Sequence, residues 1–111
     1  MSKGTGGSAE ILSENENEII YKYYNYNLNV SENRNDKRIA DGRIIINKNE
    51  IIPSENDIAL LLEQGKIFVE NSKNSWGFVE NYDHIALSFL SRVIKYYQHE
   101  KSFPQEVYYD I

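Results

Sequence analysis

The stretch EIIYKYYNYNLNV, residues 18–30, decides the class of fold, because its side chains alternate as a half-buried β-strand requires. Isoleucine and tyrosine, which favour strands, fill much of it. One set of alternate residues, interrupted by Lys22, is expected to face the core: Ile20, Tyr24, Tyr26, Leu28 and Val30. The other set is expected to face outward: Tyr21, Tyr23, Asn25, Asn27 and Asn29.

A second strand and a short helix are expected to follow. A polar turn leads into residues 38–47, whose isoleucine-rich centre predicts a strand. Pro53 and Ser54 then open a helix, with Ser54 as its N-cap and Gly65 as its left-handed end. Apolar residues at helical spacing predict the side that faces the core: Ile58, Leu61 and Leu62.

The longest helix is predicted near the end of the chain. Before it, the runs KIFVE (66–70) and WGFVE (76–80) flank a polar segment and predict a β-hairpin. Asn81 or Asp83 can cap the helix, which is expected to reach Glu100. One helical face is apolar: Ala86, Phe89, Leu90, Val93, Ile94 and Tyr97.

These elements predict an α+β fold. A final strand is expected at residues 105–111, so the order is ββαββαβ. The simplest arrangement is an antiparallel or mixed sheet with both helices packed on one face. Residues 18–111 are expected to form the single domain, and residues 1–17, rich in Gly, Ser and Glu, a flexible acidic tail.

Composition limits the classes of function. The chain has 111 residues, a net charge of −5 and a pI near 5.0, which disfavours nucleic acid and anionic membranes and favours a basic protein partner. There is no cysteine, which excludes disulfides and thiolate sites. Residues 1–10 lack the apolar segment of a secretion signal, so a cytoplasmic location is predicted, in a bacterium or in an infected host cell.

The sequence offers little for catalysis. Its two histidines, His84 and His99, fall in one predicted helix about 22 Å apart and cannot share a metal ion. We find no motif for a nucleophile, a phosphate loop or a calcium loop. The sequence therefore predicts no enzyme, no metal and no cofactor. A small hydrolase that uses His84 or His99 remains an alternative.

Tyrosine is the unusual feature, with nine in the chain. Exposed tyrosine and tryptophan supply large contact areas at protein interfaces, while the other interpretation of these rings is cross-strand packing within the sheet. We predict a partner-binding patch with aromatic and acidic members: Tyr21, Tyr23, Trp76 and Tyr108, with Glu14, Glu16, Glu18, Glu80 and Asp110 as its charged rim.

The predicted function is therefore a protein-binding module without catalysis. In size and charge the chain is similar to small acidic inhibitors that neutralise bacterial toxins, such as immunity proteins and antitoxins, and to small viral or phage proteins that block host defence. Such a module would cover a basic surface of a partner enzyme. The alternative is a viral or phage accessory protein that forms homodimers through the C-terminal strand.

Overall fold

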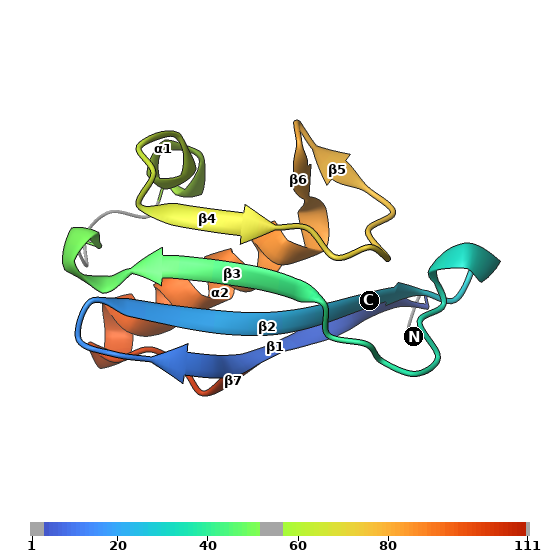
Figure 1. Cartoon of the computed structure of the whole chain (residues 1–111), viewed down its shortest axis with the longest axis horizontal. Coiled ribbons are helices and arrows are strands. Elements are labelled where there is room, and N and C mark those ends of the chain that lie inside the picture. The colour runs from blue at the N-terminus through green and yellow to red at the C-terminus, as the bar shows by residue number, and fades with distance from the viewer. Residues whose placement is uncertain (1–3, 52–56, 111) are drawn as a thin grey trace.

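A computed structural model of the chain describes residues 4–51 and 57–110, with only the backbone of Asp110. The fold is α+β, built on a five-stranded antiparallel sheet in the order β4-β3-β2-β1-β7 (Figure 1). Its strands are β1 (Thr5–Glu14), β2 (Glu18–Asn27), β3 (Gly42–Asn47), β4 (Ile67–Glu70) and β7 (Glu106–Asp110). The remaining elements are α1 (Ile58–Glu63), α2 (His84–Glu100), a small hairpin of β5 (Phe78–Val79) and β6 (Tyr82–Asp83), and two 3₁₀ turns, Ser31–Asn33 and Lys48–Glu50.

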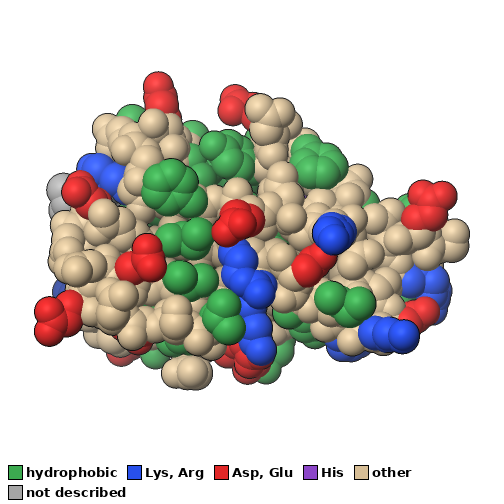
Figure 2. Space-filling view, in the orientation of Figure 1, with side chains coloured by type: hydrophobic (Ala, Val, Ile, Leu, Met, Phe, Trp, Pro, Cys, Tyr) green, Lys and Arg blue, Asp and Glu red, His purple; other side chains and the backbone are tan. Residues whose placement is uncertain are grey.

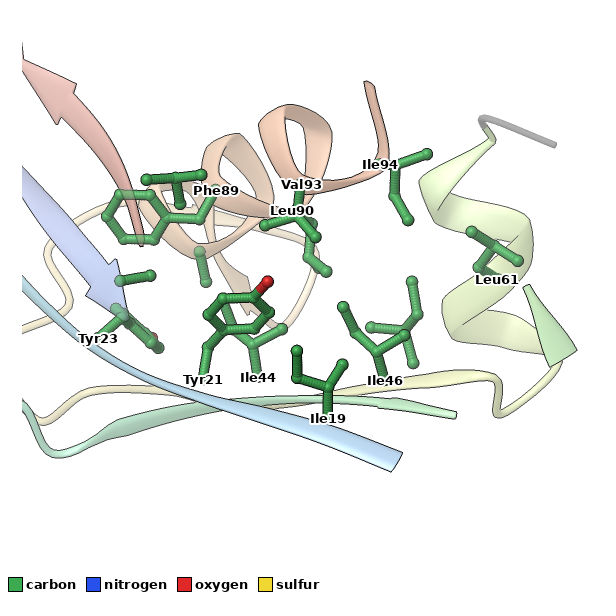
Figure 3. Packing of buried hydrophobic residues seen from close by; sticks show 14 of the residues in the cluster. Ile19, Tyr21, Tyr23, Ile44, Ile46, Leu61, Phe89, Leu90, Val93 and Ile94 are labelled. Atoms are coloured by element: carbon green, nitrogen blue, oxygen red, sulfur yellow. The ribbon is translucent and has the colours of Figure 1, made fainter. Parts of the chain in front are cut away.

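One face of the sheet lies against α2, and the core fills the space between them. In Figure 1 the helix α2 runs behind the sheet, whereas α1 lies beside the edge strand β4. Figure 3 shows Tyr21, Ile44 and Leu61 pointing into one apolar cluster with side chains of α2. The predicted apolar face of α2 is confirmed, since these residues are buried: Ala86, Phe89, Leu90, Val93 and Ile94.

The cap of α2 and the end of α1 lie where the sequence predicts them. Asp83 begins α2, its carboxylate accepting a hydrogen bond from the backbone N–H of Ile85 at 3.0 Å. Asp57 caps α1 through the N–H of Leu60, and Gly65 adopts a φ of +73° just after the helix, as predicted. The predicted cap at Ser54 lies outside the described residues.

The predicted flexible tail is wrong, because residues 5–14 form β1 inside the sheet. β1 pairs with β2 on one side and with β7 on the other. Its small residues match the large ones of its neighbours: Ser8 lies between Tyr24 and Tyr108, and Ala9 lies opposite Tyr23. Glycine and serine suggested flexibility, but here they fit between tyrosine-bearing strands.

The predicted orientation of β2 is also wrong. Tyr21 and Tyr23, expected to face outward, have no exposed surface. The inward set is Ile19, Tyr21, Tyr23, Asn25 and Asn27. The other set contains Lys22, whose ammonium reaches solvent and pairs with Glu10 on the face away from α2, where a charge need not be buried.

The predicted hairpin of residues 66–70 and 76–80 does not form. Instead β4 pairs with β3, and β5 pairs with β6, which directly precedes α2. The polar segment between β4 and β5 crosses to the start of α2, where Asp83 anchors it through Ser75. A turn does form here, with the N–H of Ser75 donating to the carbonyl of Ser72 at 3.1 Å, but the bond from Ser75 to Asp83 holds the segment at the start of α2 rather than back along β4.

Candidate functional site

The face of the sheet that points away from α2, called here the outer face, carries the exposed aromatic side chains. Figure 2 looks onto this face and shows hydrophobic side chains on both sides of a central row of basic and acidic ones. Three of its large hydrophobic side chains are about half exposed: Leu12 at 48%, Phe68 at 55% and Tyr108 at 59%. Exposed side chains of this size that share one face of a sheet make that face a candidate binding surface.

Cross-strand registry produces the charged row. Glu106, Glu10, Lys22, Arg43 and Glu70 follow one another across all five strands. Lys22 Nζ lies 3.2 Å from Glu10 Oε1, and both side chains are substantially solvated, so this ion pair contributes little to stability. The row instead divides the outer face into an aliphatic half and a tyrosine half.

The tyrosine half contains the rings that the sequence analysis expected to be buried. Arg38 stacks on both of them, with its guanidinium carbon 5.5 Å from the ring centre of Tyr24 and 5.2 Å from that of Tyr26. It also donates a hydrogen bond to Tyr24 Oη at 3.1 Å. On β7, the hydroxyl of Tyr108 donates to the carboxylate of Glu106, which raises the pKa of that hydroxyl.

The half without tyrosine, called aliphatic here for Ile20 and Ile45 although it also holds the ring of Phe68, lies toward the β1–β2 turn and the edge strand β4. Ile20 pairs with Ile45, and Ile45 pairs with Phe68, so three apolar side chains form a row across β2, β3 and β4. Ile20 and Ile45 are half-buried by one another, whereas Phe68 stands at the sheet edge. Rigid rings and branched side chains on a sheet lose little entropy on binding, which suits them to contact a partner.

A second polar cluster surrounds Asp83, which is fully buried. Its Oδ2 accepts hydrogen bonds from Tyr23 Oη at 2.9 Å, Asn25 Nδ2 at 2.5 Å and Ser75 Oγ at 2.8 Å. Tyr23 Oη also accepts from the backbone N–H of Ser72 at 2.9 Å. Burial, together with the neighbouring Asp83 charge, raises the pKa of Tyr23.

This cluster acts as a structural anchor. Tyr23, Asn25 and Ser75 all donate to Asp83, and Asp83 and Tyr23 have no exposed surface that a substrate could touch. Among the described residues, Asn25 Oδ1 and Trp76 Nε1 are the buried side-chain polar atoms that lack a hydrogen-bond partner. Neither residue lines the three surface hollows that the structure describes.

The two histidines lie apart, as expected from their spacing. His84 begins α2, donates from Nδ1 to the carbonyl of Gly77 at 2.9 Å and packs edge-on against Trp76. His99 is exposed in the last turn of the same helix. The described part of the chain holds no group of three or more acidic or histidine side chains that could bind a metal ion.

The structure does not bring the predicted patch together. Tyr21 and Tyr23 lie in the core, and Trp76 is half-buried against His84. Tyr108 remains exposed on the outer face. The acidic residues Glu14, Glu16 and Glu18 gather at the β1–β2 turn, while Glu80 lies in the β5–β6 turn; the side chain of Asp110 is outside the described part.

Sequence analysis missed several residues of the outer face: Tyr24, Tyr26, Ile45, Phe68 and Arg38. For Tyr24 and Tyr26, the presence of Lys22 in the same alternating set of β2 was the signal that could have assigned them to solvent.

Comparison with known proteins gives no match from which a function could be inferred. No family model, curated protein or solved structure matches it. Within the described residues, neither helix is long and apolar enough to cross a membrane. The arrangement of side chains therefore carries the functional argument alone.

Proposed function

We propose that this protein is a non-catalytic module that binds another protein on the outer face of its sheet. The observation that carries the proposal is the half-exposed set of Leu12, Phe68 and Tyr108 on a face that neither described helix covers. Leaving such side chains in water costs roughly 25 cal/mol per Å² of apolar surface, which a partner would recover by covering them. Tyr24 and Tyr26 extend the contact surface.

Charge favours a basic partner. The chain carries a net charge of −5, and three exposed glutamates cross the outer face in the charged row, namely Glu10, Glu70 and Glu106. These carboxylates would speed encounter with a basic surface and disfavour acidic competitors. In its specific form, the proposal is a small acidic inhibitor or immunity-type protein that covers a basic surface of a toxin or host-defence enzyme.

The polar clusters support a binding role over catalysis. The carboxylate of Asp83 already accepts hydrogen bonds from Tyr23, Asn25 and Ser75, and the ring of His84 is held by Gly77. General acid–base catalysis needs a group within hydrogen-bond reach of a bound substrate. The carboxylate of Asp83 could not meet this requirement without breaking the contacts that hold the start of α2, and the Nδ1 of His84 is already bonded to Gly77.

The test compares two matched double variants. Tyr24→Ala with Phe68→Ala removes one ring from each half of the outer face, while Tyr96→Ala with Phe78→Ala removes a partly exposed tyrosine and phenylalanine outside the sheet. Each double variant is used to capture proteins from host lysate. A protein that the control variant captures and the outer-face variant does not is then purified. We expect it to be basic and to bind the outer-face variant at least about tenfold more weakly, with the control variant unchanged.

Equal binding by the two variants would refute the outer face as the binding site. Thermal unfolding of both variants serves as the check on folding. A catalytic turnover that survives in the outer-face variant and is lost in His84→Ala would instead favour the hydrolase alternative.

A further inference from the structure

The strand β7 leaves one edge of the sheet open. It pairs with β1, and no other described strand pairs with it. Tyr108 at its centre is 59% exposed, and Glu106 is also exposed. Open strand edges can accept a further strand, from a second copy or from another protein.

Backbone geometry identifies the groups that face this edge. The N–H of Ile11 donates to the carbonyl of Gln105 at 3.0 Å, which fixes the phase of the antiparallel ladder between β1 and β7. Since bonded pairs alternate along such a ladder, Val107 and Tyr109 bond to β1. The backbone groups of the alternate residues therefore point away from β1: Glu106, Tyr108 and Asp110.

A second copy of the chain fits this edge poorly. The two-fold antiparallel pairing that overlaps all of β7 is centred on Tyr108 and places residue 106 of each copy opposite residue 110 of the other. Both positions are acidic, Glu106 and Asp110. Like charges directly opposite one another destabilise a strand pair, so this edge discourages self-association.

We infer that the free edge of β7 accepts an extended, basic segment of the partner protein as a sixth, antiparallel strand. Lysine or arginine of that segment would lie opposite Glu106 and Asp110, and an apolar residue would lie opposite Tyr108. Backbone hydrogen bonds would supply affinity, and the alternate charges would select the sequence. The inference rests on the proposed function and specifies how the partner is recognised.

The experiment uses the full chain and synthetic peptides with the core sequence Lys-Thr-Val-Thr-Lys. One peptide is N-methylated at both lysines and the valine, whose amides would donate to β7. A second is N-methylated at both threonines, whose amides would point away. A third replaces both lysines with glutamate. Binding is measured by fluorescence anisotropy. Hydrogen exchange of the Tyr108 amide reports whether the peptide is bound at the free edge of β7.

We expect the unmodified and threonine-methylated peptides to bind and to slow exchange of the Tyr108 amide at least about tenfold. The lysine- and valine-methylated peptide and the glutamate peptide should not bind. Glu106→Lys should abolish binding of the basic peptide, while Glu100→Lys, an equal change of net charge at an exposed site on α2, should leave it unchanged.

Three results would overturn the inference: no binding of the basic peptide, equal binding of both methylated forms, or concentration-dependent dimers that protect the Tyr108 amide without a peptide. None of them bears on the Tyr24 and Phe68 variants, neither of which alters β7. If Tyr24→Ala with Phe68→Ala weakened partner binding while the peptides failed to bind β7, the proposed function would stand and the added strand would be refuted.

Discussion

The two faces of β2 carry the same residue type in opposite roles. Tyr21 and Tyr23 point inward, where Tyr21 Oη donates to the carbonyl of Pro104 at 2.6 Å and Tyr23 Oη donates to Asp83. Tyr24 and Tyr26 point outward beneath the guanidinium of Arg38. A tyrosine can be buried only where its hydroxyl finds a partner. The partners, rather than the tyrosines, therefore decide which face becomes core.

The first way to break this comparison is to remove the shared inner partner. Asp83→Ala leaves the hydrogen-bonding groups of Tyr23, Asn25 and Ser75 without their acceptor and removes the N-cap of α2. We expect a loss of about 3–5 kcal/mol in the free energy of unfolding, measured in urea. This is the largest effect of those proposed.

Asp57→Ala is the matched control for the helix cap. Asp57 is exposed and caps α1 through Leu60, so its loss should cost about 1 kcal/mol. If both aspartate variants lost the same stability, Asp83 would be an ordinary cap and the inner hydroxyl of Tyr23 would not depend on it.

Alkaline pH tests the inner tyrosines in the unmodified protein. Burial raises the pKa of Tyr21 and of Tyr23 above the ordinary value, with Glu14 and Asp83 adding to the respective shifts. Above about pH 10 the unfolded chain loses these two protons while the folded chain keeps them, so stability falls as pH rises. Each tyrosine lowers the free energy of unfolding by about 1.4 kcal/mol per pH unit in this range. Below about pH 10 both states keep the proton, so neither tyrosine makes stability depend on pH.

Urea unfolding between pH 9.5 and 11.5 measures this slope. Tyr21→Phe should remove its half of the two-tyrosine contribution, and absorbance at 295 nm should show that the buried phenols ionise only as the protein unfolds. A slope unchanged in Tyr21→Phe would mean that this hydroxyl titrates equally in both states.

Local patterns were enough to predict the class of fold and most of its elements. The α2 helix, its cap at Asp83 and its apolar face could be read from the spacing of side chains, because a helix places residues i, i+3 and i+4 together. β1 could not be predicted, since its glycines favour a strand only when tyrosine-rich neighbours lie on both sides. That match depends on pairings far apart in the chain.

The candidate site was predicted only in kind. The abundance of tyrosine indicated a ring-bearing surface, and Tyr108 is on it. Tyr24 and Tyr26 were assigned to the wrong face because alternation alone does not say which set faces inward, and both sets of β2 contain tyrosine, so that only Lys22 marked the outer set. The decisive contacts, from Tyr21 to Pro104 and from Tyr23 to Asp83, join segments that the sequence does not show to be neighbours.

The smallest effects come from deleting a single hydroxyl on each face. Tyr21→Phe leaves the buried carbonyl of Pro104 without its 2.6 Å hydrogen bond, which should cost about 1–1.5 kcal/mol in the free energy of unfolding. Tyr24→Phe removes only a solvent-accessible hydrogen bond with Arg38, and water replaces it, so the cost should stay below about 0.5 kcal/mol. Both changes remove one hydroxyl oxygen from a tyrosine of β2. The two variants therefore differ little in strand propensity or buried ring area, and the difference in their stability reports the hydroxyl partners. Equal losses would show that the hydroxyl partners do not distinguish the two faces, and the orientation of β2 would then depend on Lys22 alone.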